Sequence, residues 1–492
     1  MMKIRIVSLA VLSAALSGCA MFGPDRAPPP APQPAHYTAG TQSALLTVAD
    51  SEEQEFVSGA QGEAAWWRTY DSDVLNDLVA EGLQNSPSLA TAQHALDAAR
   101  QQLQGQIGST LLPSVDANFG VSRQNGLGLP VLQKPTLQYD IFEAGIGASY
   151  TFDFFGAAYM SDRALAGQVQ QQAWHLDATR RALAANIVKA TISAASLQDQ
   201  VATVAQMADL AERQYRQVAA RHQAGSASRD EMLSAEQRAA DTAALLPPLK
   251  AQLLSIRHAQ AVLLGRTPDQ APEPVALDTL HLPARVPVSV PSELLHHRPD
   301  ILAAEAAVQV AADRVGAAIA AKYPSLTLSA SYGHGGFDWS TFASPAGAIW
   351  NVGGAVTQPL FHGGALDARK READAGYDGA LSNYRQTVLS AFETVADDLS
   401  TLEQDAGALA QAQRADHAAQ EESEDVDRRY KLGAVPYSAA LAAGQLHQAA
   451  HVQYIRARAA RLTDTAALFD AMGDPEAAPR PAADEMSVQL LP

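Results

Sequence analysis

The chain has 492 residues, a formal net charge of −18 and a single cysteine. The acidic balance argues against nucleic acid or anionic lipid as a partner, and one cysteine excludes a disulfide framework. Alanine is abundant and only 6% of the residues are aromatic, which is typical of long, closely packed helices.

The N-terminal segment has the layout of a secretory signal peptide over residues 1–18. Its apolar run, Ile6–Leu16, is shorter than the roughly 20 residues that span a bilayer as a helix. The following Leu-Ser-Gly-Cys resembles the bacterial lipobox, so we expect Cys19 to begin the mature chain and to carry covalent lipid. By resemblance to other lipoproteins, Ala20 at the next position favours sorting of the protein to the outer membrane. The alternative is a buried cysteine that happens to follow a signal sequence.

Sequence landmarks recur along the chain at offsets of 207 to 212 residues. Pro87 and Pro299 each open a predicted helix, because proline favours the first helical position. The other pairs are Pro113 with Pro324, Gly156 with Gly363, Gly225 with Gly433, and Gly265 with Gly473. We therefore predict a tandem duplication. Its parts are a signal peptide (1–18), a lipidated proline-rich tether (19–61), a first repeat (62–270), a second repeat (271–475) and a flexible tail (476–492).

Each predicted repeat contains two stretches that alternate like membrane β-strands. From Phe142 to Phe154 the even positions are apolar and the odd positions are small or polar, and residues 114–122, 325–332 and, more weakly, 348–356 alternate similarly. Alternation over about ten residues suits a tilted strand between lipid and water. A half-buried strand of a soluble sheet shows the same pattern. By parity, we expect Asp116 and Asp153 to face a water-filled interior.

Two predicted helices of unusual length follow the strand pairs, Gly156–Gly225 and Gly363–Gly433, and neither contains a proline. Each would extend about 100 Å. In the second, apolar residues from Leu381 to Leu409 recur every three or four positions, as in a coiled-coil seam. A single helix of this length has no core, so each must pack against neighbours.

Several stretches in fixed order resemble the TolC-like outer-membrane efflux proteins, and within them the NodT-type lipoprotein branch. They are Trp66–Leu83, Pro247–Pro268, Arg298–Val308 and Tyr323–Gly333. The resemblance implies a mainly α protein with a membrane β-barrel. In that fold a homotrimer forms twelve strands, four per chain, continued by a long α-helical periplasmic barrel. It further implies a duct that exports small molecules or drugs from an inner-membrane pump through a periplasmic adaptor, with outer-membrane lipid around the barrel.

The resemblance also assigns places in that architecture. Residues 42–80, 266–298 and the end of the last helix would form a belt around the helical barrel, and residues 125–140 and 334–346 would form external loops. The turns at the far helix ends would form the periplasmic tip. There we expect adaptor contacts at Gly225, Ser226, Gly433 and Ala434.

The tip should also carry the gate. Some family members have acidic residues six and nine positions after the second tip glycine, where this chain has Ala439 and Ala442. We therefore expect the closed tip to be held by Asp230, Glu231, Arg428, Arg429 and Tyr430. The alternative is that these are ordinary solvated charges at helix ends.

No pattern for catalysis, cofactor binding or metal binding is present in the sequence. His296 and His297 are adjacent and would point to different sides of a helix. We therefore expect no enzymatic activity, no metal site and no cofactor besides the lipid on Cys19. Three alternatives stay open: the exit duct of a type I protein secretion system, a lipid-anchored trimeric helical spacer or adhesin, and a soluble periplasmic scaffold.

Overall fold

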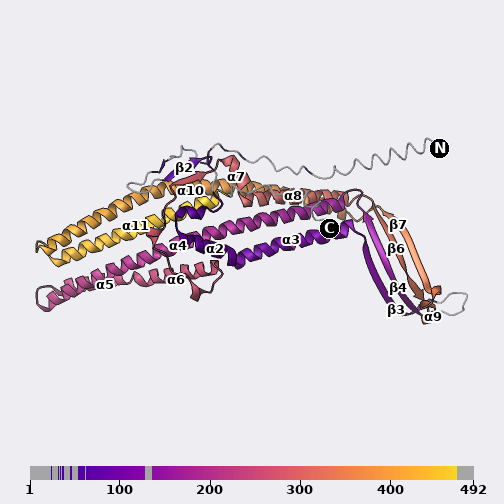
Figure 1. Ribbon diagram of the computed structural model, residues 1–492, viewed down its shortest axis with the longest axis horizontal. Helices are drawn as coiled ribbons and strands as arrows, with labels where there is room; N and C mark the ends of the chain where they lie inside the picture. Colours follow the sequence, from indigo (N-terminus) through magenta and orange to yellow (C-terminus); the bar gives the residue numbers. More distant parts are fainter. Residues whose placement is uncertain are drawn as a thin grey trace.

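The computed structural model describes residues 63–127 and 136–473, together with residues 54–60 and positions 24, 32, 34, 36–37 and 45–46. The signal peptide, Cys19 and the tail 476–492 lie outside the described residues. The molecule is elongated, with a β-sheet at one end, two helical hairpins at the other and a long helical body between them (Figure 1).

Two helices of 67 residues each run through this body, α4 (Ala157–Gln223) and α10 (Ala365–Lys431). Towards the sheet, α4 packs against α3 (Pro87–Leu111), and α10 packs against α8 (Pro299–Ala320). Towards the hairpins, α4 packs against α5 (Arg229–Ala243) and α6 (Leu246–Leu263), and α10 packs against α11 (Tyr437–Ala471). Both predicted long helices are confirmed. Among the described helices, none is both long and apolar enough to cross a bilayer.

The seam predicted on the second long helix is its buried stripe. Tyr384, Val388, Phe392, Val395, Leu399, Leu402, Ala406 and Leu409 are buried, and Leu381 is partly buried against the same cluster. Because these residues recur every three or four positions, they share one face of α10. Helix α4 also contacts α8 and α11, so the two long helices and their partners form one connected layer.

The sheet at the other end has four antiparallel strands in the order β3-β4-β6-β7. They are β3 (Ser114–Leu127), β4 (Thr136–Phe152), β6 (Ser325–Gly336) and β7 (Ala348–Thr357). The predicted loop boundaries were wrong, because residues 125–127, 136–140 and 334–336 continue the strands. The alternation of apolar and polar residues weakens in these segments, whereas the hydrogen bonds between the strands continue through them. The sequence pattern therefore predicted strands that were too short. Between β6 and β7 lie α9 (Trp339–Phe342) and η5 (Pro345–Gly347).

A belt of short elements lies midway along the helical body (Figure 1). Its sheet pairs β1 (Leu45–Leu46) with β2 (Gln54–Ser58) and β2 with β5 (Arg285–Val288). Strands β1 and β2 fall inside the predicted tether, and their pairing joins them to the belt. The other belt elements are η1 (Trp66–Tyr70), α2 (Asp73–Asn85), η3 (Pro268–Gln270), η4 (Leu277–Thr279) and α7 (Pro291–His297).

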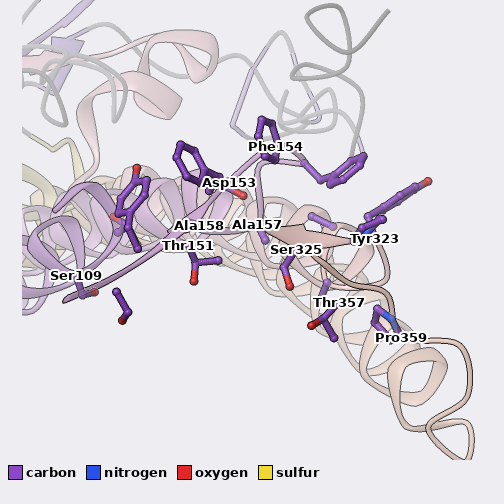
Figure 2. Close-up of a pocket in the computed structure, with 18 of the residues that line it drawn as sticks. Ser109, Thr151, Asp153, Phe154, Ala157, Ala158, Tyr323, Ser325, Thr357 and Pro359 are labelled. Carbon is purple, nitrogen blue, oxygen red and sulfur yellow. The ribbon is translucent and has the colours of Figure 1, made fainter. Parts of the chain in front are cut away.

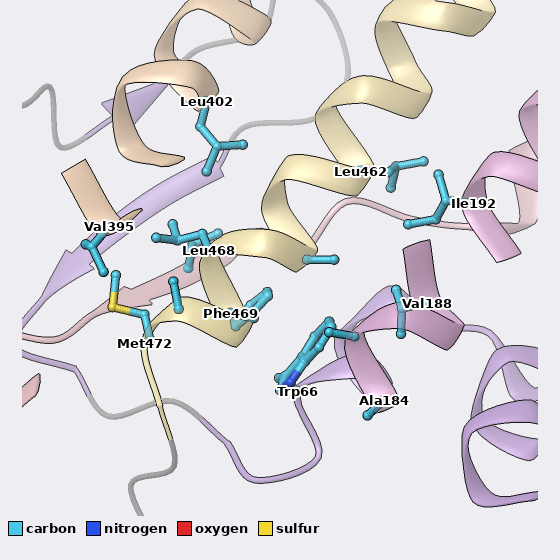
Figure 3. Close-up of a cluster of buried hydrophobic side chains, with 14 of the residues drawn as sticks. Trp66, Ala184, Val188, Ile192, Val395, Leu402, Leu462, Leu468, Phe469 and Met472 are labelled. Atoms are coloured by element: carbon cyan, nitrogen blue, oxygen red, sulfur yellow. The ribbon is translucent and has the colours of Figure 1, made fainter. Parts of the chain in front are cut away.

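The largest hydrophobic core lies where this belt meets the long helices (Figure 3). The Trp66 ring stacks on Phe469 with ring centroids 5.3 Å apart. The fully buried Tyr70 donates its hydroxyl hydrogen bond to the carbonyl oxygen of Leu462 at 2.8 Å. The belt therefore fastens the end of α11 to α4 and η1, as the predicted belt segments require.

Candidate functional site

The strand register places the polar positions of all four strands on one face of the sheet. Asp116 pairs with Gly147, Thr151 with Thr327, and Ser331 with Asn351, and directly opposed residues share a face. Ser114 and Ser149 lie 2.8 Å apart at their hydroxyl oxygens, and Thr151 and Thr327 lie 2.9 Å apart at theirs. Asp116 therefore lies on the polar face with these residues, and its position toward a water-filled interior stays a prediction.

Asp153 lies just beyond the end of β4 at Phe152, so the strand register does not assign it to a face. Its carboxylate accepts a hydrogen bond of 2.8 Å from the backbone N–H of Tyr159 and so supports the turn into α4. Asp153 lines a cavity of about 380 Å³ where sheet and helices meet, together with Thr151, Ser325 and Thr357 (Figure 2). The polar face of the sheet thus leads to this junction.

The opposite face of the sheet is apolar and exposed. Phe119, Trp350 and Val352 have relative exposures of 69%, 75% and 73%. Its other exposed members are Val115, Val121, Ile146, Leu328, Tyr332 and Val356. Such a continuous apolar surface marks contact with lipid or with another protein.

Aromatic clusters border this apolar face at both ends. Phe142 lies 5.9 Å from Trp339 between ring centroids at the loop end, and Tyr150 lies 4.9 Å from Phe152 at the helical end. Beyond Phe142, Arg123 and Asp140 form an ion pair at 3.7 Å. Aromatic girdles of this kind flank the lipid-facing band of membrane barrels. Sequence analysis missed them, although the aromatic residues near the strand ends were a usable signal.

The first hairpin turn connects α4 to α5. Gly225 has a φ of +77° and donates its N–H to His222 O at 2.9 Å, and Ser226 donates its N–H to Arg221 O at 2.8 Å. This left-handed end of a helix favours glycine. Ser228 then caps α5 in a reciprocal pair with Glu231, at 3.1 Å and 2.9 Å. The carboxylate of Glu231 therefore stabilises the start of α5.

The second hairpin turn repeats this geometry between α10 and α11. Gly433 has a φ of +75° and donates its N–H to Tyr430 O at 2.8 Å, and Ala434 donates its N–H to Arg429 O at 2.9 Å. Both turns lie at the end of the molecule opposite the sheet (Figure 1). The four predicted adaptor-contact residues are exposed there.

The five gate candidates lie at this end but on two separate hairpins. Arg428 pairs with Asp425 at 3.5 Å and Arg429 with the same carboxylate at 4.0 Å, so both pair within α10. Neither arginine has an ion pair with Asp230 or Glu231 of its own chain among the described residues. Tyr430 packs on Tyr437, with ring centroids 5.1 Å apart.

One link between the hairpins was missed in the sequence. Arg213 of α4 pairs with Asp209 at 2.5 Å and hydrogen-bonds to Tyr437 of α11, and these two hydrogen bonds raise the pKa of its guanidinium. Tyr437 therefore contacts both Tyr430 on α10 and Arg213 on α4. No spacing in the sequence indicates this contact, because it depends on how two distant helices pack.

The belt holds a buried charged cluster. Arg461 is fully buried and donates to Gln54 Oε1 at 2.7 Å and to the carbonyl oxygen of Leu402. Burial lowers the pKa of Arg461 to about 10. Burial and a shared hydrogen bond with Asp464 raise the pKa of Asp405 to about 7. These groups join β2, α10 and α11 in the middle of the molecule.

Comparison with known proteins identifies this architecture. The family model for outer membrane efflux proteins matches residues 78–266 and 290–474. The chain is similar to the pyoverdine export outer membrane protein OpmQ of Pseudomonas aeruginosa, at 28% identity covering 93% of this chain and 95% of that protein. It is also similar to the toluene efflux pump outer membrane protein TtgF of Pseudomonas putida (29%; 96% and 97% covered) and to nodulation protein T of Rhizobium leguminosarum (26%; 88% and 84%).

Solved structures agree in fold. The CmeC outer membrane channel of Campylobacter jejuni superposes with a TM-score of 0.81 at 21% identity, covering 95% of this chain and 98% of that one. The open state of the MtrE outer membrane channel of Neisseria gonorrhoeae superposes with a TM-score of 0.73 at 25% identity, covering 91% and 98%. The protein is a channel component of the outer membrane and not an enzyme. The chain belongs to the outer membrane efflux protein family, whose members serve as the outer-membrane part of tripartite efflux systems.

Proposed function

We propose that three copies of this chain close one twelve-stranded barrel in the outer membrane and continue it as a helical tunnel across the periplasm. The observation that carries the proposal is the four-stranded sheet, whose edge strands β3 and β7 pair with no other described strand. In lipid, backbone polar groups must be satisfied within the protein, so such a sheet has to close. Four strands are too few to close alone, since membrane barrels have at least about eight.

The direction of the edge strands supports closure between copies. The strands alternate in direction across the sheet, so β3 and β7 run in opposite directions. Joining β7 of one chain to β3 of the next therefore continues the antiparallel ladder. One face would then present the apolar band to lipid, and the other would line the pore with hydroxyl, amide and carboxylate groups.

Cysteine cross-linking tests this closure. Asn118→Cys in β3 is combined with Asn351→Cys, Gly353→Cys or Ala355→Cys in β7, all positions on the polar face. Two cysteines form a disulfide only with Cα atoms about 4.4–6.8 Å apart. We expect one combination to give linked products of up to three chains. Asn118→Cys with Ser329→Cys in the interior strand β6 is the control. Products limited to single chains for all three combinations would reject closure.

We propose that the hairpin turns meet the periplasmic adaptor and an inner-membrane pump, and that the cargo is small molecules. The exposed Gly225, Ser226, Gly433 and Ala434 support an end-on contact, and the relatives named for pyoverdine and toluene support the cargo class. Cells lacking the protein should accumulate a small fluorescent efflux substrate while protein secretion is unchanged. The opposite pattern would favour the exit duct of a type I secretion system.

We keep the gating role of Asp230, Glu231, Arg428, Arg429 and Tyr430 as a proposal for contacts between neighbouring chains. Supporting it, Asp230 is exposed on the first turn of α5, and the arginines reach only carboxylates of their own helix within one chain. The double change Asp230→Ala with Arg429→Ala keeps the net charge and should raise single-channel conductance in planar bilayers. Unchanged conductance would reject the gating role.

We also propose the tandem duplication and the lipid anchor. The duplication is supported by Gly265 and Gly473, whose φ angles are +74° and +78°. A Cβ at Gly265 would lie 2.4 Å from the carbonyl oxygen of Asn85, and a Cβ at Gly473 would lie 2.4 Å from that of His297. Asn85 and His297 each stand just before a helix that begins with proline, α3 and α8.

The anchor rests on the lipobox resemblance at Cys19, so Cys19→Ser should remove the lipid mass from the intact protein in mass spectrometry. If the Cys19→Ser protein still carried the same lipid mass as the unchanged protein, the anchor would be rejected.

A further inference from the structure

A group of metal-ligating side chains joins the two helices of the second hairpin. His447 and His451 are four residues apart on α11, so they lie on the same helix face. Helix α10 runs antiparallel beside α11 (Figure 1). Asp416 of α10 contacts both histidines. The three residues come from two elements and lie between the tip and the belt.

The distances within this group suit one small cation. Asp416 Oδ2 lies 3.1 Å from His451 Nδ1, and Asp416 Oδ1 lies 3.6 Å from His447 Nε2. One ligand atom from each residue can be chosen so that all lie within 4.8 Å of one another. Ligands at 2.0–2.1 Å from a tetrahedral Zn²⁺ are about 3.3 Å apart, so rotation of the side chains has to bring the three ligand atoms from within 4.8 Å to that separation.

The carboxylate of Asp416 is not satisfied by hydrogen bonds alone. Its Oδ1 atom is buried and has no hydrogen-bond partner among the described residues, although it faces the ring nitrogen of His447. Buried polar oxygens without a partner are costly, so each needs an explanation. The side-chain exposures of 16% for Asp416, 23% for His447 and 39% for His451 leave the group open enough for a water ligand.

Charged groups of both signs lie on the neighbouring elements. Asp199 of α4 and Asp278 of η4 interact electrostatically with each other, and Asp199 also interacts with His451 and Arg458. Arg458 places a positive charge beside Asp199, and the backbone N–H of Leu277 donates a hydrogen bond to it, so Asp199 is already compensated. The negative charge that a divalent cation would offset here is that of Asp416, which contacts both histidines.

We propose that Asp416, His447 and His451 form a binding site for a divalent transition-metal cation of the Zn²⁺ type, which ties α10 to α11. Imidazole nitrogens with a carboxylate select such cations over Ca²⁺ and Mg²⁺, which take oxygen ligands. Three protein ligands leave a fourth position for water. The site lies on the helical hairpin, apart from the polar face of the sheet, and does not depend on the cargo of the channel.

Calorimetric titration of the full-length protein with Zn²⁺ tests the proposal. The protein is purified in detergent with a tag that contains no histidine run and is treated with a chelator. We expect one Zn²⁺ per chain, with affinity at least tenfold weaker in Asp416→Asn, His447→Ala and His451→Ala. His417→Ala is the matched control, because His417 lies next to Asp416 but faces Glu421 at 3.9 Å and is exposed. It should bind Zn²⁺ as the unchanged protein does.

A second measurement does not depend on the variants folding. Co²⁺ added to the unchanged protein should give the visible absorption bands of a four-coordinate nitrogen and oxygen site, and Zn²⁺ should remove them. The proposal is overturned if the unchanged protein binds no Zn²⁺ and gives no such Co²⁺ bands. It is also overturned if binding persists in folded Asp416→Asn, because the ion would then be held elsewhere.

Discussion

At the scale of single residues, the buried Arg461 determines how firmly the belt holds the hairpin. Its guanidinium donates to Gln54 and Leu402 and faces Asp405 and Asp464. Arg461→Leu would leave the buried Gln54 Oε1 and the carbonyl oxygen of Leu402 without this donor, at a cost of about 1–3 kcal/mol for each group. We therefore expect a clearly lower unfolding temperature in detergent at pH 8. Arg414→Leu, at an exposed position on α10, is the control and should leave that temperature unchanged. Equal stability of both variants would contradict this role for Arg461.

A second residue makes stability depend on pH. Burial raises the pKa of Asp398 from 3.8 to about 6, and its Oδ2 atom has no hydrogen-bond partner among the described residues. Because the folded-state pKa is the higher one, this stabilising contribution is complete below about pH 4 and is lost as the pH rises through about 6.

Asp398→Asn should therefore stabilise the protein at pH 7.5, by about 1 kcal/mol once partial solvent exposure is discounted. At pH 4 the variant and the unchanged protein should unfold at the same temperature. Thermal unfolding at both pH values checks this. A variant that is less stable at pH 7.5 would mean that the Asp398 carboxylate is held by a favourable charge instead.

At the scale of elements, two glycines with the same backbone angle should differ in their tolerance of a side chain. Gly225 and Gly265 have φ angles of +77° and +74°, but a Cβ at Gly225 meets nothing within 4 Å, whereas one at Gly265 lies 2.4 Å from the carbonyl oxygen of Asn85. Gly225→Ala should cost only the left-handed backbone penalty of about 1–2 kcal/mol. Gly265→Ala should cost more, because α6 and α2 must also separate. Thermal unfolding compares them, and equal losses would contradict the close approach.

The two faces of β7 give a second matched pair. Val352 lies on the exposed apolar face and Asn351 on the polar face. Arginine on the lipid side of a membrane strand costs about 2–4 kcal/mol at the bilayer midplane, whereas the lumen side accepts it. Val352→Arg should therefore reduce the amount of protein assembled in outer membranes, and Asn351→Arg should assemble normally with altered ion selectivity. Normal assembly of Val352→Arg would contradict the assignment of the lipid face.

Much of the structure at the scale of helices and strands was predictable, because apolar residues recur in the sequence with the period of each element. The strand faces follow from alternation around Ile146 and Leu328, and the buried seam of α10 follows from the spacing of Tyr384 to Leu409. Contacts between distant elements were not predictable. Tyr437 with Arg213, Asp416 with the histidines of α11, and Gln54 with Arg461 each depend on the register of two packed segments. His447 and His451 did carry a local signal, the four-residue spacing, but their carboxylate partner lies on another helix.

At the scale of the whole molecule, a single chain has neither a closed sheet nor a closed helical wall. Its sheet exposes an apolar face and two edge strands, and its helices form one connected layer along an elongated body (Figure 1). A single layer cannot enclose a pore, so the proposed duct requires neighbours on both sides. Closure by three chains would satisfy the strand edges and place the polar face of every sheet on the inside.

The most direct test is the mass and shape of the detergent-purified protein. Light scattering gives the protein mass of the particle, and negative-stain microscopy gives its projection. Three chains in a particle longer than about 100 Å, with a barrel at one end, are the predicted result. A compact single chain, or a protein that stays soluble without detergent, would contradict the shared barrel and the tunnel.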